Sequence, residues 1–139
     1  AGMGWGLPAS VALKLVYRDR PVVCVTGDGG YMMTVHAIST AMQYRLPILC
    51  VVLNNNALGM VRGHQPPDRL IASEFVETDN AAVARGFGAF GVQVKDSRDL
   101  PGAIRQALAS GLPAVVDVLI DRGPSPDDWR ASAHRAGET

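Results

Sequence analysis

Two short polar segments of this sequence carry residue types that suit metal and phosphate chemistry. Gly27-Asp28-Gly29-Gly30 sets a carboxylate among glycines, which allow a backbone to approach an anion closely. Asn54-Asn55-Asn56 follows later, with 26 residues between Asp28 and Asn55. A carboxylate is poorly placed against a phosphate group unless a hard divalent cation lies between them, and oxygen ligands suit magnesium. The two segments therefore predict one magnesium and phosphate site.

The elements that must position these segments are predicted to be strands. Short runs rich in β-branched residues indicate four buried strands, at residues 21–26, 48–53, 91–94 and 114–120. Each polar segment directly follows one of the first two strands. Because ligands bind at the carboxyl ends of parallel strands, we expect the amide oxygens of residues 54–56 and the carbonyls that follow them to face the same crevice as Asp28.

Helical spacing separates the predicted strands. One helix should start near Thr34, with an apolar face formed by Val35, Ile38 and Met42. A second should begin near residue 97, capped by Asp96 or Ser97, and its apolar positions are Leu100, Ile104, Ala107 and Leu108. Alternating strands and helices predict an α/β fold with three α/β/α layers and a mainly parallel sheet.

The boundaries of the domain follow from the same pattern. Residues 1–122 form the predicted ligand-binding domain, and residues 123–139 form a loosely held C-terminal tail. A long irregular segment runs from residue 54 to about residue 77, as functional or mobile loops do. The chain begins at Ala1 without an initiator Met and enters a glycine-rich stretch at once. We therefore expect the fold to be incomplete at its N-terminus.

The composition disfavours several classes of partner. Thirteen basic residues balance thirteen acidic ones without runs of either sign, which argues against nucleic acid and anionic membranes as partners. The longest apolar stretch, residues 48–53, is far shorter than the roughly 20 residues that span a bilayer. Cys24 and Cys50 lie inside apolar runs and should be buried free thiols. The absence of a disulfide framework and of a leader predicts a cytoplasmic protein.

Other interpretations of the motifs are weaker. Alone, Gly-Asp-Gly is an ordinary turn, and asparagines merely tolerate left-handed backbone, but both occur here at strand ends. Gly2-Met-Gly4-Trp-Gly6 has two glycines at dinucleotide-like spacing, yet no strand precedes it and the third glycine is misplaced. No Gly-Lys-Ser/Thr follows a glycine loop, which excludes a nucleotide P-loop.

Over nearly its whole length the sequence resembles the C-terminal, diphosphate-binding domain of thiamine-diphosphate enzymes of the acetolactate synthase and pyruvate decarboxylase group. That family combines Gly-Asp-Gly, about two dozen further residues and Asn-Asn, after a Gly-x-Met-Gly-x-Gly-x-Pro stretch. Here Ala1-Gly-Met-Gly-Trp-Gly-Leu-Pro8 matches the stretch apart from Ala1 in the place of the first glycine.

The resemblance implies a role for each motif residue. Asp28, the Asn55 side chain and the Ala57 carbonyl would ligate Mg²⁺. The N–H groups of Gly27, Gly29 and Gly30 would hold the diphosphate, and Leu58-Gly59-Met60 would close over it. Met3 would lie beneath the cofactor and bend it into a V, and backbone groups of Ala1 and Met3 would bind the aminopyrimidine.

Two departures from the family pattern affect the expected substrate. In acetolactate synthases Gly-Met-Val is followed by two residues and a Trp that helps to select the acceptor; here Gly59-Met60-Val61 is kept, but His64 takes the Trp position. A loop histidine is a surface residue by default, yet its pKa range suits proton transfer, which makes His64 a candidate catalytic residue. Gly30 replaces the usual Ser and removes a hydroxyl donor.

The resemblance also implies what the chain would need from a partner. In the family, a glutamate on a separate pyrimidine-binding domain, usually across a dimer interface, activates the cofactor. None of Glu74, Glu77 and Glu138 is placed to replace it, so the chain alone should bind cofactor without turnover, within a homo-oligomer.

The leading hypothesis is therefore part of a thiamine-diphosphate- and magnesium-dependent decarboxylase or carboligase acting on a small 2-oxo acid, most similar to acetolactate synthase. One alternative is a thiamine-dependent 2-oxo acid oxidase or oxidoreductase that passes electrons to a cofactor such as FAD. The other is a non-catalytic module that keeps the cofactor site for assembly or regulation.

Overall fold

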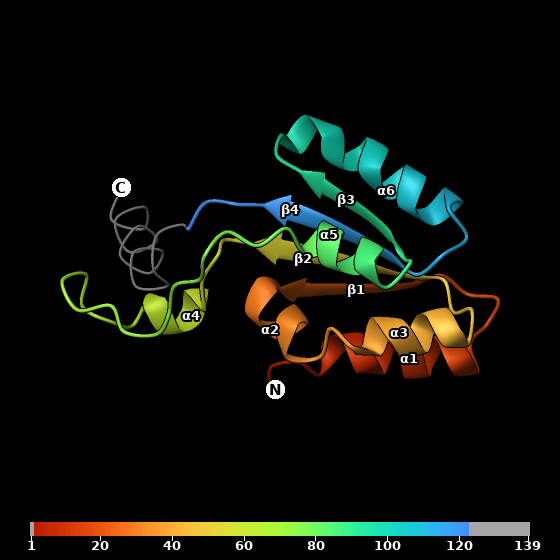
Figure 1. Ribbon diagram of the computed structural model, residues 1–139, viewed down its shortest axis with the longest axis horizontal. Helices are drawn as coiled ribbons and strands as arrows, with labels where there is room; N and C mark the ends of the chain where they lie inside the picture. The colour runs from red at the N-terminus through yellow and green to blue at the C-terminus, as the bar shows by residue number, and fades with distance from the viewer. Residues whose placement is uncertain (1, 123–139) are drawn as a thin grey trace, which may run out of the picture.

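The computed structural model describes residues 2–122. Helices and strands alternate along most of this length, as Figure 1 shows. The elements in chain order are α1 (Gly6–Val16), β1 (Val22–Gly27), α2 (Asp28–Met33), α3 (Ala37–Gln43), β2 (Ile48–Asn54), α4 (Gly59–Arg62), α5 (Asn80–Gly86), β3 (Phe90–Val94), the 3-10 turn η1 (Ser97–Asp99), α6 (Leu100–Ala109) and β4 (Ala114–Leu119).

The four strands form one parallel sheet in the order β1-β2-β4-β3. All four arrows in Figure 1 point the same way, so the carboxyl ends of the strands gather at one edge. β4 comes last in the sequence but lies between β2 and β3, where Asp117 is in register with Val52 on one side and Gln93 on the other. β1 and β2 are neighbours, as the predicted site requires.

Helices cover both faces of the sheet, which confirms the three-layer prediction (Figure 1). One core cluster joins α1, α2, α3 and α5 to one face, around the fully buried Tyr31 and Ile38. The other cluster packs α6 against β2, β3 and β4. α6 does not extend over β1, where the side chains of Val23 and Val25 are 54% and 63% exposed.

All four predicted strands are present, and Cys24 and Cys50 are buried and free, as predicted. The predicted helix with Val35, Ile38 and Met42 on its apolar side is present as α3, but it begins at Ala37 rather than near Thr34, and α2 before it was not predicted. The chain enters α2 directly at Asp28, leaves it at Met33, and begins α3 at Ala37. Two glycines in α2 oppose helix formation by about 1 kcal/mol each, and burial of Tyr31 in the core offsets that cost.

The helix predicted near residue 97 is confirmed as η1 followed by α6, and the Asp96 side chain accepts the Arg98 N–H at 2.9 Å as a cap. The sequence did not indicate α1 or α5. The segment from residue 54 to residue 77 is partly ordered, because it contains α4 and an antiparallel bridge between Ala57 and Glu74. The predicted tail, 123–139, lies outside the described residues.

One ion pair links this segment to the residues that follow β4, and a second lies within the segment. The Glu74 carboxylate accepts from Arg62 at 3.0 Å and from Arg122 at 2.8 Å. The Arg62 guanidinium, with a smaller contribution from Arg122, lowers the pKa of Glu74. Arg122 also donates to the Asn55 carbonyl at 3.2 Å. The end of β4 therefore contacts both ends of the segment.

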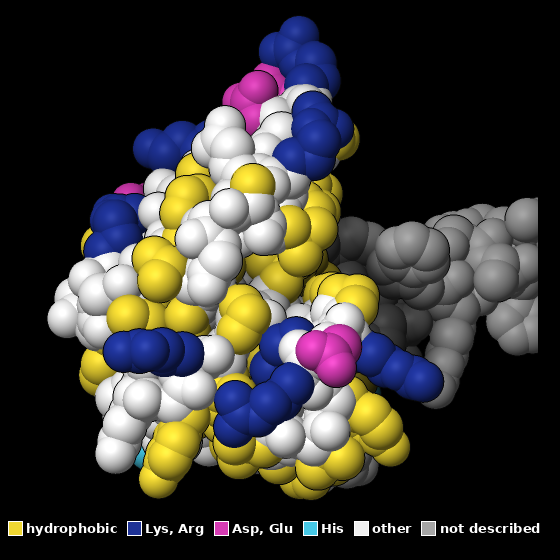
Figure 2. All heavy atoms as spheres, turned by 90° about the vertical axis from the view of Figure 1, so that its right-hand side faces the viewer, with side chains coloured by type: hydrophobic (Ala, Val, Ile, Leu, Met, Phe, Trp, Pro, Cys, Tyr) yellow, Lys and Arg dark blue, Asp and Glu magenta, His cyan; other side chains and the backbone are white. Residues whose placement is uncertain are grey.

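The end of the molecule opposite the carboxyl edge carries Lys and Arg side chains interspersed with hydrophobic ones, as Figure 2 shows. Few acidic side chains lie on this view, and the basic ones are separated from one another by apolar and neutral surface.

Within residues 2–122, none of the helices has the length and apolar character required to cross a membrane.

Candidate functional site

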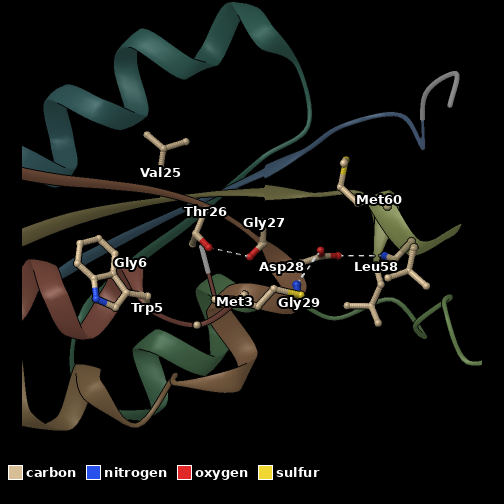
Figure 3. A pocket seen from close by; sticks show the side chains of 16 residues that line it. Met3, Trp5, Gly6, Val25, Thr26, Gly27, Asp28, Gly29, Leu58 and Met60 are labelled. Carbon is tan, nitrogen blue, oxygen red and sulfur yellow. Dashed lines mark hydrogen bonds between the residues drawn. The ribbon is translucent and has the colours of Figure 1, made fainter. Parts of the chain in front are cut away.

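Asp28 is the first residue of α2 and lies at the carboxyl end of β1, with only 5% of its surface exposed. Its two carboxylate oxygens accept backbone N–H groups, from Gly29 at 2.8 Å and from Ala57 at 3.1 Å (Figure 3). Burial raises the pKa of the Asp28 carboxyl, and these N–H groups offset that increase only in part. No cation within the described part of the chain pairs with Asp28.

Ala57 reaches Asp28 because of the way its neighbours are bonded. In the bridge to Glu74, the N–H of Leu58 donates to the Ser73 carbonyl and the N–H of Phe75 donates to the Asn56 carbonyl, both at 2.8 Å. The N–H and C=O of an extended residue point to the side opposite those of its neighbours. Ala57 therefore directs its own backbone groups away from the bridge and towards Asp28.

The three consecutive asparagines have different roles. The Asn54 amide donates to the Thr78 carbonyl and to Asp117, and the Asn56 amide oxygen accepts the Thr78 N–H. These two side chains form hydrogen bonds within the protein and line a hollow on another side of Asp28 from the one that Asn55 lines. Among the described residues, none accepts or donates a hydrogen bond to the Asn55 side chain, which lines the crevice beside Asp28.

Several hollows border Asp28, and two of them are lined by most of the predicted site residues. One, of about 380 Å³, is lined by the Gly2–Gly6 stretch, the end of β1 and the start of α4. The other, of about 650 Å³, lies at the ends of β1, β2 and β4 and is lined by Asn55 and Arg122 among others. Both are bordered by Gly27, Asp28, Ala57, Gly59 and Met60. The structure thus brings most of the predicted site residues to one continuous surface.

The glycines keep this surface open. A Cβ at Gly59 would lie 2.7 Å from the Asn55 amide nitrogen, so the missing side chain lets Asn55 lie against α4. A Cβ at Gly29 would lie 2.6 Å from Leu58 and 3.3 Å from the end of Met3. At Gly30 it would meet the Thr26 hydroxyl at 2.8 Å. Larger side chains at these three positions would displace the residues that line the crevice.

Met3 lies over the first hollow rather than in the core, and 54% of its surface is exposed. Figure 3 shows its side chain beside Gly29, across from Leu58. Gly4, with φ of 78°, turns the chain here, and its carbonyl accepts the Thr34 hydroxyl at 3.0 Å. The stretch around Met3 is thereby tied to the end of α2.

One predicted site residue, His64, is not brought to the crevice. His64 is exposed just after α4, its Nδ1 lies 2.7 Å from the Met60 carbonyl, and it lines neither hollow. Its catalytic role stays a prediction. Ala1 lies outside the described residues.

Sequence reasoning missed other residues that line the hollows, among them Trp5, Val25, Thr26, Val61, Asp121 and Arg122. Asp121 and Arg122 had a usable signal, because they follow β4 and the carboxyl ends of parallel strands share one edge. Trp5 and Val25 line the first hollow because of tertiary contacts that the sequence does not indicate.

The arrangement suits a hard cation bound to an anion. It provides one buried carboxylate, one amide and backbone groups, without a cluster of three or more His, Cys, Asp or Glu side chains among residues 2–122 that could hold a metal. Such a set offers few protein ligands, as magnesium sites that take their remaining ligands from water and phosphate do.

Comparison with known proteins identifies the family of this domain. Residues 1–118 match the family of the C-terminal TPP binding domain of thiamine pyrophosphate enzymes. The chain is 40% identical over 126 residues, 89% of its length, to the protein YdaP of Bacillus subtilis (strain 168), provisionally named as thiamine pyrophosphate-containing. It is 36% identical over 128 residues, 86% of its length, to the large subunit of acetolactate synthase isozyme 3 of Escherichia coli (strain K12).

A solved structure agrees as well. Benzoylformate decarboxylase from Polynucleobacter necessarius superimposes with a TM-score of 0.80 at 29% identity, over 90% of this chain and 25% of that one. The chain spans 22% of the length of both curated relatives named above.

The fold is that of an α/β domain with a crevice at the carboxyl edge of a parallel sheet. More specifically, the chain belongs to the thiamine pyrophosphate enzyme family, as its C-terminal domain that binds thiamine pyrophosphate, also called thiamine diphosphate. The family resemblance inferred from the sequence is thereby confirmed.

Proposed function

We propose that this chain binds thiamine diphosphate through Mg²⁺ and serves a decarboxylase or carboligase that acts on a small 2-oxo acid. The main support for this proposal is the buried Asp28 carboxylate beside Asn55 and Ala57. No cation from the described part of the chain balances its charge. A buried carboxylate of this kind is stabilised when a cation binds.

In this proposal each residue has a defined task. Asp28, Asn55 and the Ala57 carbonyl would hold the metal, and the N–H groups of Gly27, Gly29 and Gly30 would face the diphosphate. Leu58, Gly59 and Met60 would exclude water from it. Met3, exposed over the first hollow, would support the cofactor from below.

When bound, the cofactor supplies a nucleophilic carbon and accepts the electron pair that decarboxylation releases. The chain orients it, and we propose that a pyrimidine-binding domain elsewhere in a homo-oligomer supplies the activating glutamate. The names of relatives support this class of reaction, because they include an acetolactate synthase and a benzoylformate decarboxylase.

Calorimetry on the complete gene product tests the proposal. Thiamine diphosphate should bind only with Mg²⁺, and Asp28→Ala should weaken binding by at least about a hundredfold, since it removes the only carboxylate that lines both hollows. Asp68→Ala, which removes an exposed carboxylate from the same long segment, should bind like the unmodified protein. Unchanged binding in Asp28→Ala would contradict the assignment, provided that circular dichroism shows the variant to be folded.

A further inference from the structure

Asp117 lies at the middle of the sheet, away from both hollows, and is completely buried. Four groups donate to its carboxylate. The Asn54 amide, the Asn80 N–H and the Gln93 amide reach one oxygen at 3.3, 3.1 and 3.0 Å, and the Asn80 amide reaches the other at 3.1 Å. These donors come from the end of β2, the start of α5 and β3.

This carboxylate is costly for a purely structural role. Its hydrogen-bond partners are all neutral, and within residues 2–122 no Lys, Arg or His forms an ion pair with it. Burying an unpaired charge costs several kcal/mol, and apolar residues of similar volume often stabilise such positions better. Besides its charge, a carboxylate differs from an amide in that both of its oxygens only accept hydrogen bonds.

That property fixes the orientation of the Asn54 amide. With its nitrogen held by Asp117 and by the Thr78 carbonyl at 3.0 Å, Asn54 must turn its oxygen the other way, where it accepts the Asn56 N–H at 3.0 Å. If the Asn54 amide were flipped, its oxygen would face the acceptor oxygens of both Asp117 and Thr78. Asp117 therefore permits only one of the two amide orientations.

The oriented amide in turn holds the loop that carries the site. Asn56 adopts left-handed backbone geometry, with φ of 52°, which asparagine tolerates. The hydrogen bond from its N–H to Asn54 closes a turn of a kind that Asx side chains stabilise. Past this turn, the Ala57 N–H meets Asp28. Asn55 lies within the turn, on the crevice side.

We propose that Asp117 is a positioning residue for the cation site: by fixing the Asn54 amide, it holds the turn that presents Asn55 and Ala57 to Asp28. The magnesium part of this inference rests on the proposed function. The geometric part concerns only the chain itself and can be tested without a ligand.

The test compares Asp117→Asn with Gln93→Met in the complete gene product. Both remove hydrogen bonds at Asp117, but Gln93 lies on β3 and its side chain forms no hydrogen bond with residues 54–57. Hydrogen exchange without ligand should show the Asn56 and Ala57 amides about tenfold faster in Asp117→Asn and unchanged in Gln93→Met. Calorimetry at saturating thiamine diphosphate should show Mg²⁺ binding about tenfold or more weaker in Asp117→Asn alone.

Asn54→Leu removes the same support from the loop, and it is the variant to test if Asp117→Asn does not fold. It should reproduce both effects, and the double variant should be little worse than either single one, because the two residues act in series. Equal loop exchange in Asp117→Asn and Gln93→Met, or unchanged exchange in Asn54→Leu, would overturn the proposal. Absence of magnesium binding in the unmodified protein would instead contradict the proposed function, and the exchange data would still decide the role of Asp117.

Discussion

At the scale of single residues, the charge on Asp28 is held in a place where water cannot stabilise it. Burial raises its pKa above the ordinary value of 3.8, so the folded chain binds this proton more tightly than the unfolded chain does. Between the ordinary and the raised pKa, the contribution of Asp28 to the free energy of unfolding falls as pH rises. Above the raised pKa the full penalty is present, and below the ordinary pKa it is absent.

We therefore expect the unligated protein to lose stability relative to Asp28→Asn as pH rises through that window. Urea unfolding of both proteins across the acid range measures the difference, and hydrogen-bond changes caused by the amide contribute only a constant offset. Saturating Mg²⁺ and thiamine diphosphate should reverse the trend, because cation binding favours the ionised form. A difference that stays flat across the acid range would contradict burial as the main cause.

The residues of the site were predictable to the extent that their roles depend on neighbours in the sequence. Asp28 and Asn55 could be placed together, since each follows a buried strand. The different roles of the three asparagines, residues 54–56, could not be predicted. They depend on hydrogen bonds with Thr78 and Asp117, which lie far from them in the sequence.

At the scale of elements, close contact between α5 and β3 depends on a missing side chain. A Cβ at Gly91 would lie 2.2 Å from the Ala81 carbonyl oxygen, a backbone atom that cannot move without displacing the helix. Gly102, near the start of α6, has open space at the same position. The two glycines thus differ in surroundings although both lie inside regular elements.

Gly91→Ala should therefore lower the free energy of unfolding by about 2 kcal/mol or more, as overpacking does. Gly102→Ala should raise it by up to about 1 kcal/mol, because alanine favours helix. Chemical denaturation of the two variants measures both effects. Equal effects of the two substitutions would show that α5 shifts freely on β3.

The strands were predictable because runs of β-branched residues are buried on both faces in a parallel sheet. α1 was missed for a physical reason. Its outer face keeps large apolar side chains exposed, at Leu13, Leu15 and Val16, while Lys14 is buried with its amine donating to the carbonyls of Arg18 and Arg20. The apolar and polar positions therefore do not alternate with a clear helical period.

At the scale of the whole molecule, β1 is an edge strand with an apolar face that α6 leaves uncovered. Unpaired edges and exposed apolar patches favour association. Val23 lies on this face, whereas Val76, which is 84% exposed, lies in the long segment after β2 and outside the strands of the sheet.

A preparation of this chain alone should therefore self-associate as its concentration rises, and Val23→Lys should reduce that association. Val76→Lys adds the same charge outside the exposed face of β1 and should have little effect on association. Sedimentation velocity over a range of concentrations distinguishes these outcomes. Equal effects of both lysines would point to net charge rather than to the β1 face as the cause.

The central position of β4 also sets an order of events during synthesis. Among the strands that the structure describes, β3 pairs only with β4, and the Asn54 amide meets its carboxylate partner only when Asp117 has emerged from the ribosome. Pairings between strands distant in sequence form late, because the chain between them must first be ordered. A nascent chain that already contains Asp28 and Asn55 therefore still lacks the support that shapes their loop, and cofactor capture becomes one of the last steps in the maturation of this domain.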